Sequence, residues 1–164
     1  MKIRKAQDTE IGILMEKYEN ARRFMEEHGN PAQWGKTYPT RACVEEDIRE
    51  GNCYVCEEEE RIIGVFYYRP GNDPTYEVIE GGEWISGAPY GVVHRITSDG
   101  TVKGTASFCL EWALKQCGNL RIDTHRDNTV MQRLLQKNGF SYCGIIHIED
   151  GSERLAYQKL RDGE

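Results

Sequence analysis

One segment of the chain restricts the fold more than any other, because a β-rich run passes through a glycine turn directly into an amphipathic helix. Residues 90–97 have the composition of a central strand, and the helix that follows ends at Gly118. The apolar residues of this helix recur at helical spacing and are Ala106, Cys109, Leu110, Ala113, Leu114 and Cys117. Gly104 and Ala106 leave no bulky side chain over the first helical turn, whose backbone N–H groups lack intrahelical partners. The segment therefore predicts an α/β fold with an anion site, suited to a nucleotide-like pyrophosphate, at the start of the helix.

Length and charge narrow the class of protein. With 164 residues we expect one domain, residues 1–164, with a core that needs no metal or disulfide. No apolar leader follows Met1 and no apolar run is long enough to cross a bilayer, so we expect a cytoplasmic protein without a membrane partner. The 27 acidic and 21 basic residues give a net charge of −6, which argues against a nucleic-acid partner and suits a cationic acceptor. A charge of this size also serves solubility alone.

Six cysteines are scattered along the chain without the spacing of a disulfide framework, so we expect them to be reduced. Cys53 and Cys56 form a C-x-x-C pair inside a strand-like run. Because no second pair and no neighbouring histidine accompany it, core packing is favoured over zinc or redox chemistry. We therefore expect no metal site.

The remaining patterns predict a mixed α/β layout of order β-α-α-β-β-β-α-β-α-β-β, with helices on both faces of a partly antiparallel sheet. The connection over residues 70–89 is long, rich in Gly and Pro, and is a candidate lid. The predicted strands cover residues 3–6, 53–57, 61–69, 90–97, 120–124, 142–149 and 154–160. The predicted helices run from Asp8 or Thr9 to about residue 28, over residues 41–50, through the apolar stripe described above, and from Asp127 or Asn128 to Gly139.

The glycine turn lacks the two commonest phosphate-binding signatures, the Walker loop and the dinucleotide fingerprint. It resembles motif A of the GNAT family of N-acetyltransferases, whose consensus Q/R-x-x-G-x-G/A corresponds to residues 101–106, with Thr101 in place of Gln or Arg. A second stretch resembles the family's motif B, N-x-x-x-x-x-L-x-x-x-x-G-F, and its matching residues are Asn128, Leu134, Gly139 and Phe140. With the element order, the resemblance covers essentially the whole chain.

The resemblance implies the GNAT fold, a mostly antiparallel sheet flanked by helices on both faces, and acetyl-CoA as cosubstrate. In the family the strand before the phosphate turn is splayed from its neighbour, and its free backbone groups, here those of His94, Arg95 and Ile96, bind pantetheine. The turn that would cradle the pyrophosphate comprises Val102, Lys103, Gly104, Thr105, Ala106 and Ser107. Asn128 matches a residue that contacts the cofactor near the pantetheine arm, and it is equally suited to capping a helix. The resemblance also implies that this chain could form a homodimer, as members of the family do.

Attack of an amine on a thioester requires the removal of a proton from the ammonium group and protonation of the leaving thiolate. The family's usual acid is a tyrosine seven residues after the motif B asparagine, where this chain has Leu135, which cannot donate a proton. His94 is the first catalytic candidate, because its ordinary pKa is close to neutrality and it lies beside the expected thioester. Tyr90, four residues upstream on the same strand face, is the second. Each also has a structural alternative, His94 as a hydrogen-bonded strand residue and Tyr90 as a half-buried aromatic.

Aromatic and polar residues outside the strand are candidates for the acceptor side. Aromatic side chains bind apolar groups and ammonium cations, although each could equally belong to the core; the candidates are Trp34, Tyr38, Tyr76 and Trp84. His125 follows a strand at the edge where α/β sites open, or it satisfies a polar turn. We expect Arg95 to alternate away from His94 and to pair with an acid rather than a phosphate.

The function expected from these features is acetyl transfer from acetyl-CoA to a primary amine of a small molecule or peptide, by direct attack in a ternary complex. The alternative is a non-catalytic acyl-CoA-binding module, which the residues Leu135 and Thr101 favour. A toxin that acetylates charged tRNA fits poorly, because the chain lacks a basic face.

Overall fold

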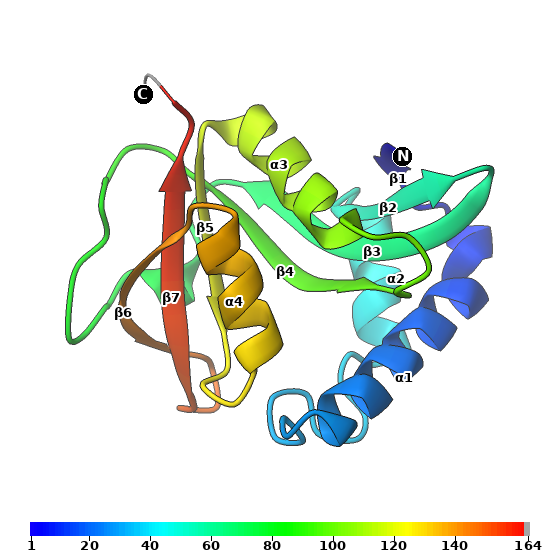
Figure 1. The fold of residues 1–164 in the computed structure, drawn as a ribbon, viewed down its shortest axis with the longest axis horizontal. Helices are drawn as coiled ribbons and strands as arrows, with labels where there is room; N and C mark the ends of the chain where they lie inside the picture. Colours follow the sequence, from blue (N-terminus) through cyan, green and yellow to red (C-terminus); the bar gives the residue numbers. More distant parts are fainter. Residues whose placement is uncertain (163–164) are drawn as a thin grey trace.

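The structure is a computed structural model that describes residues 1–162. Its elements follow the predicted order and confirm the mixed α/β class (Figure 1). The strands are β1 (Lys2–Lys5), β2 (Cys53–Glu58), β3 (Arg61–Pro70), β4 (Gly91–Ser98), β5 (Asn119–Thr124), β6 (Ser141–His147) and β7 (Glu153–Leu160). The helices are α1 (Ile11–Glu27), α2 (Arg41–Arg49), α3 (Thr105–Cys117) and α4 (Thr129–Lys137), with the short 3-10 helices η1 (Asp8–Glu10) and η2 (Pro74–Tyr76).

The strands form one seven-stranded sheet of order β1-β2-β3-β4-β5-β7-β6. Neighbouring strands are antiparallel except β4 and β5, which are parallel and are connected through α3. A parallel pair needs such a crossover, because the chain must return to the same end of the sheet. The turn between β4 and α3 therefore lies at the carboxyl end of a parallel strand, where α/β folds commonly bind ligands.

Each face of the sheet has its own cover. Helices α3 and α4 lie in front of the sheet in Figure 1 and pack Leu110, Ala113 and Leu135 on strand residues such as Val93. On the opposite face, α1 and α2 bury Leu14 and Val44 against β2 and β3. Beyond them, η2 and its flanking loop cover β4, β6 and β7 through a third cluster of Tyr67, Tyr76, Tyr90, Val92, Ile146 and Ala156.

Glycines and a polar cap set the limits of α3 and α4. Gly104 precedes α3 with φ +81° and Gly118 follows it with φ +73°, a left-handed conformation that glycine adopts without steric cost. The side chain of Asn128 accepts a hydrogen bond from the N–H of Met131 and so caps α4. These local signals explain why the helix limits were predictable.

The connection between β3 and β4, expected to be a candidate lid, is instead attached along its length. It forms the outer loop at the left of Figure 1. Tyr76 in η2 is 1% exposed, and Glu80 exchanges two backbone hydrogen bonds with Ile145 of β6. Further along, the N–H of Ile85 donates to Oε1 of the buried Gln158 of β7 at 2.7 Å. The loop is a packed wall of the molecule, because these long-range contacts satisfy a backbone that has little regular structure.

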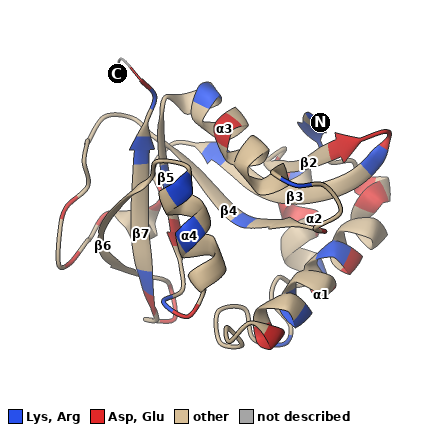
Figure 2. Cartoon of the chain, in the orientation of Figure 1, with Lys and Arg blue, Asp and Glu red and all other residues tan. Residues whose placement is uncertain are grey.

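Charges of both signs alternate along α1, whereas the β2–β3 hairpin is acidic (Figure 2). All six cysteines are free thiols, and Cys53 and Cys56 pack into clusters on opposite faces of the sheet, as core residues. Within residues 1–162 no helix combines the length and the apolar composition needed to cross a membrane.

Candidate functional site

The edge of β4 is open over the half of the strand that precedes α3. Strand β4 pairs with β5 only at Gly91 and Val92, opposite Leu120 and Arg121, and the two strands then diverge. His94, Arg95 and Ile96, predicted to offer free backbone groups, lie in this splayed half. The Ile96 side chain is buried on the α3 side, so only its backbone is available at the edge.

A bulge in the same half of β4 corrects one prediction. Tyr67 of β3 pairs with His94 and Val65 pairs with Thr97, so two residues of β4 stand opposite one residue of β3. Arg95 is one of the two and has φ +49°. The guanidinium of Arg95 lies 4.6 Å from the centroid of the Tyr67 ring, whose centroid is 5.7 Å from that of His94. The expectation that Arg95 alternates away from His94 is therefore wrong, because the bulge interrupts the period of two and places both side chains on one face.

Each of the three guanidinium nitrogens of Arg95 donates to a protein group. Its Nε and Nη2 donate to Asp47 of α2 at 2.9 and 2.7 Å, and its Nη1 donates to the Tyr38 hydroxyl at 2.9 Å. The carbonyl of Arg95 accepts a hydrogen bond from Tyr18 of α1. Burial raises the pKa of Asp47, although the adjacent guanidinium opposes this rise. The expected pairing of Arg95 with an acid is present, and it connects α1, α2 and β4.

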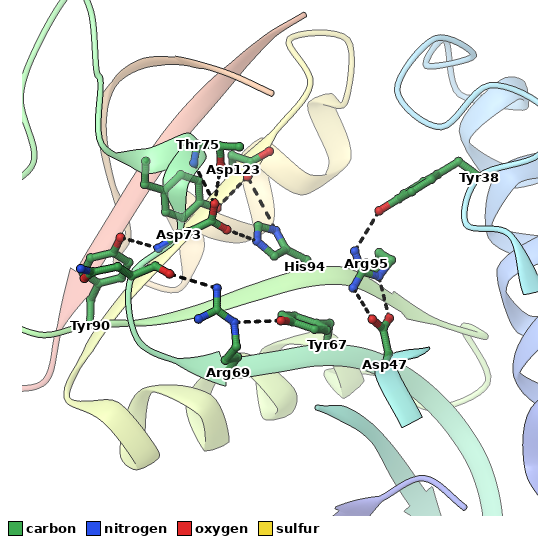
Figure 3. A network of polar contacts seen from close by, with 12 residues as sticks. Tyr38, Asp47, Tyr67, Arg69, Asp73, Thr75, Tyr90, His94, Arg95 and Asp123 are labelled. Carbon is green, nitrogen blue, oxygen red and sulfur yellow. Dashed lines mark hydrogen bonds and ion pairs between the residues drawn. The ribbon is translucent and has the colours of Figure 1, made fainter. Parts of the chain in front are cut away.

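His94 lies between two carboxylates on the face of the sheet opposite α3 (Figure 3). Its Nε2 is 2.7 Å from Oδ2 of Asp73, a residue of the loop before η2. Its Nδ1 is 3.8 Å from Oδ2 of Asp123, near the end of β5. The Tyr76 hydroxyl donates to that same Asp123 oxygen at 2.6 Å. The exposed fraction of the side chain is 24% for His94 and 11% and 12% for the two aspartates, so the three groups form a largely buried site that solvent still reaches.

The donors around Asp73 determine which nitrogen of His94 carries a hydrogen. Asp73 Oδ1 accepts from the N–H and the hydroxyl of Thr75 at 3.0 and 2.7 Å. Burial alone would raise the pKa of Asp73, but the hydrogen bonds from His94 and Thr75 outweigh it and hold the pKa far below its usual range. An ionised carboxylate can only accept, so Nε2 of His94 is the donor. In the neutral ring Nδ1 is then the basic nitrogen, and it faces Asp123.

Tyr90, the second catalytic candidate, is 9% exposed and holds the loop that carries Asp73. Its hydroxyl accepts a hydrogen bond from the backbone N–H of Asp73 at 2.9 Å. The guanidinium of Arg121 lies 4.0 Å from the centroid of its ring and 4.1 Å from that of Trp84. This placement fits the structural alternative for Tyr90, because its hydroxyl contacts the support of His94 rather than His94 itself.

The turn between β4 and α3 has the features of an anion site. The helical hydrogen bonds of α3 begin at the N–H of Phe108, which donates to the Gly104 carbonyl, so the preceding N–H groups of the first turn are unpaired. A Cβ built on Gly104 would have no atom within 4 Å, which leaves the space over the turn open. Thr105 is turned inward, where its hydroxyl donates to the Val102 carbonyl. Lys103 is exposed, and Ala106 and Ser107 complete the first turn.

Asn128 combines its capping bond with a long-range contact. Its Oδ1 accepts from Met131, and its Nδ2 donates to Oε1 of Gln33 at 2.9 Å. Gln33 lies in the connection between α1 and α2, and its carbonyl accepts from Arg154 of β7. Gln33 therefore joins the two halves of the splayed sheet, and the sequence contained no local signal for this contact.

The residues expected on the acceptor side are dispersed. Trp34 packs on the cluster that contains Leu14 and Val44, and its ring contacts that of Tyr38. The Tyr38 side chain is 39% exposed, and its hydroxyl accepts a hydrogen bond from Arg95. Trp84 contacts the Tyr76 ring at a tilt of 53°, with the ring centroids 5.3 Å apart, and its Nε1 donates to the Tyr76 carbonyl. His125 accepts from the N–H of Asp127 in the turn after β5, and burial together with Arg154 lowers its pKa. Among these residues, Tyr76 approaches His94 most directly, with ring centroids 5.9 Å apart.

Sequence reasoning did not assign a role to Asp73 or Asp123, the two acids beside His94. A signal existed for each of them. Asp73 precedes Pro74 and Thr75, a typical start of a short helix, and Asp123 lies near the carboxyl end of the strand beside β4. What the sequence could not supply was the fold of the connection over residues 71–90, which brings Asp73 back over β4.

Solved structures of similar fold are known. A GNAT-family acetyltransferase from Streptococcus agalactiae is 31% identical, with a TM-score of 0.90 over 98% of this chain and 95% of that one. A putative acetyltransferase from Staphylococcus aureus is 23% identical, with a TM-score of 0.70 over 98% and 99% of the two chains. A ribosomal-protein-alanine N-acetyltransferase from Brucella melitensis is 18% identical, with a TM-score of 0.65 over 98% and 100%. No protein-family model and no curated protein matches the chain.

Proposed function

Since the chain belongs to the GNAT family of acetyltransferases, we propose that it transfers the acetyl group of acetyl-CoA to a primary amine of a small molecule or peptide. The observation that carries this proposal is the continuous path formed by the open edge of β4, His94 on that strand and the glycine turn at its end. One linear cosubstrate with an acyl end and a pyrophosphate can lie along the whole path.

The residues of this path fit acetyl-CoA. The unpaired N–H groups at the start of α3 and the open space over Gly104 suit a pyrophosphate. The edge of β4 beside His94, Arg95 and Ile96 is not paired with β5, so backbone groups there, other than the Arg95 carbonyl that accepts from Tyr18, can hydrogen-bond the amides of a pantetheine arm. Asn128 retains its role as the cap of α4, and its Nδ2 is held by Gln33, so a cofactor contact there would require exchange of that hydrogen bond.

His94 is the group proposed to take the proton from the acceptor. Its Nε2–H is held by Asp73, and its Nδ1 is free of any hydrogen bond to the described residues. A base needs a free lone pair within reach of the proton that it removes, and Nδ1 of the neutral ring has one. Tyr90 acts through Asp73 in this proposal, as a positioning residue.

An acyl-CoA-binding module without catalysis remains the second candidate, because Leu135 is fully buried at the position of the usual family acid. If the protein does catalyse the transfer, the leaving thiolate takes its proton from the amine or from water, because Leu135 cannot supply one. Turnover separates the two candidates, since a binding module releases no free thiol in the presence of any amine.

The test is an acetylation assay with acetyl-CoA and a panel of primary amines, in which thiol release and acetylated product are both measured. The panel should include polyamines, amino sugars and an alanine-initiated peptide, the last because one structural neighbour is named for an alanine acceptor. We expect at least one amine to be acetylated in proportion to the thiol released. Binding of acetyl-CoA without turnover on any amine would favour the non-catalytic module.

A further inference from the structure

His94 and Asp123 leave a gap between two hydrogen-bond acceptors. The distance from His94 Nδ1 to Asp123 Oδ2 is 3.8 Å, too long for a hydrogen bond. In the neutral ring both atoms are acceptors, because Nε2 carries the ring hydrogen and Asp123 Oδ2 receives the hydroxyl hydrogen of Tyr76. Burial and the neighbouring Asp123 raise the pKa of Tyr76 well above its ordinary value, so the phenol stays protonated and stays a donor. With the ring neutral, the two facing acceptors have no hydrogen of their own to share.

One nitrogen with several N–H groups fits this gap. A donor placed about 2.8 Å from each acceptor satisfies both, and only a group with at least two hydrogens on one atom, such as water or an amine nitrogen, can do so. An ammonium group supplies three hydrogens and a positive charge, which Asp73 and Asp123 on either side of the ring would stabilise. Asp123 Oδ1, which accepts no hydrogen bond from residues 1–162, provides further capacity.

We propose that the acceptor's ammonium group binds between Asp123 and Nδ1 of His94, with Asp73 as the positioning residue that holds the ring hydrogen on Nε2 and so aims Nδ1 of the neutral ring at the amine. This inference rests on the proposed function, and it deepens it by naming the groups that bind the reacting nitrogen.

Protons and electron pairs balance over the transfer. The ammonium gives one proton to His94 Nδ1, which makes the ring an imidazolium between two carboxylates. The lone pair freed on nitrogen forms the C–N bond to the thioester carbon, and the C–S bond breaks with its electron pair on sulfur. The amine nitrogen gives a second proton to that sulfur, so that an amide and a free thiol result. The imidazolium returns its proton to solvent, which reaches the partly exposed ring.

The first experiment uses the protein without acetyl-CoA and n-butylammonium chloride as the probe. Long-range proton–nitrogen NMR distinguishes the two ring nitrogens of each histidine, and the chain has four histidines. We expect His94 to show the Nε2–H tautomer and its Nδ1 resonance to move to saturation as the probe is added. Tetramethylammonium chloride is the control, because it carries the charge and has no N–H group. Equal shifts with both cations, or an Nδ1–H tautomer in the free protein, would overturn the proposal.

The matched variants are Asp123→Asn and Asp150→Asn. An asparagine in place of Asp123 can still accept from Tyr76, so the fold is kept while the charge is lost. Asp150 accepts from Ser152 in the exposed β6–β7 turn and has no part in the site. We expect Asp123→Asn to weaken n-butylammonium binding about tenfold or more, as for loss of a charged hydrogen bond, and Asp150→Asn to bind like the parent. Unchanged binding in a folded Asp123→Asn variant would contradict the proposal.

Kinetics with the acceptor found in the amine panel separate the two aspartates. We expect Asp123→Asn mainly to raise the KM of the amine. We expect Asp73→Asn to lower kcat and to shift the pH at which activity rises. The charged and titratable groups around His94 are Tyr67, Asp73, Tyr76 and Asp123, which contact or closely approach the ring, and Asp47 and the adjacent Arg95, which lie further off. Unchanged kcat and pH profile in Asp73→Asn would remove its positioning role.

The outcomes for the ammonium site and for the proposed function are independent. A protein that binds n-butylammonium at His94 and acetylates no amine contradicts the proposed function alone. A protein that acetylates amines while n-butylammonium leaves His94 unaffected contradicts the ammonium site alone.

Discussion

At the scale of single residues, the chemistry of His94 depends on groups that are distant in sequence. Asp73 lies in the β3–β4 connection and Asp123 in β5, and both reach the ring only through the tertiary fold. The sequence indicated His94 through its strand and its titration range. It could not indicate the carboxylates, nor the bulge at Arg95, because a bulge depends on the pairing of two strands.

Replacing His94 tests whether it removes the proton. The glutamine side chain of a His94→Gln variant can still donate to Asp73 and has no basic nitrogen, so we expect kcat to fall by about 10²–10⁴-fold, the usual contribution of a general base. The control His147→Gln alters a more exposed histidine on β6 and should leave the rate unchanged. Steady-state kinetics at several pH values measure both variants. Full activity in His94→Gln would exclude the catalytic role.

The Arg95–Asp47 pair is predicted to be a structural connection. Arg95→Met would leave Asp47, which is 5% exposed, buried without its cation, and breaking a buried pair in this way costs about 3–5 kcal/mol. Arg49→Met is the matched control, because the Arg49–Glu46 pair is exposed and such pairs contribute roughly 0–1 kcal/mol. Urea unfolding gives both free energies. An equal loss of unfolding free energy in the two variants would show that the buried Arg95–Asp47 pair stabilises the fold no more than the exposed Arg49–Glu46 pair.

At the scale of elements, the strand, turn and helix around residues 90–118 were predictable, because their signals are local. Gly104, Gly118 and the apolar stripe determine where α3 begins, where it ends and which face it buries. The β3–β4 connection was not predictable, since the contacts of Tyr76, Glu80 and Ile85 are with β5, β6 and β7. A long stretch rich in Gly and Pro is typical of a lid. In the structure, long-range hydrogen bonds instead fix this connection against β6 and β7.

The glycine turn can be tested by two equivalent substitutions. Gly104 and Gly151 both have positive φ, and a Cβ on either would meet no atom within 4 Å. Gly104→Leu and Gly151→Leu should therefore cost a similar free energy of unfolding, about 1–2 kcal/mol for a left-handed residue. Only Gly104→Leu places a side chain over the first turn of α3, so we expect it alone to weaken acetyl-CoA binding by at least about tenfold. Calorimetry would contradict this account if both variants bound like the parent.

At the scale of the whole molecule, the site exists because the sheet separates into two halves. Pairing between β4 and β5 stops after Val92, and the face opposite α3 is covered by α1 and α2 on one half and by the η2 loop on the other. His94 lies where these two covers meet. The element order was sufficient to predict the fold class. The position of His94 between the α1–α2 layer and the η2 loop could be learned only from the structure.

The free energy of unfolding should depend on pH through the ionisation of Asp73. Its pKa in the folded protein is depressed below 3.8, so the ionised carboxylate stabilises the fold above that pH, and this contribution is lost as the pH falls toward the folded pKa. Asp73→Asn should therefore be less stable than the parent at about pH 6, and the difference should narrow by about pH 3. Urea midpoints at both pH values measure it. The same difference in stability at both pH values would show that ionisation of Asp73 does not stabilise the fold.

The central claim, that this chain uses acetyl-CoA, is tested most directly by calorimetric titration of the purified protein with acetyl-CoA, because the result does not depend on knowing the acceptor. We expect saturable binding with a micromolar Kd and a stoichiometry of one cosubstrate per chain. The absence of binding at millimolar acetyl-CoA would contradict it, and the fold would then stand without the acetyl-CoA-dependent reaction.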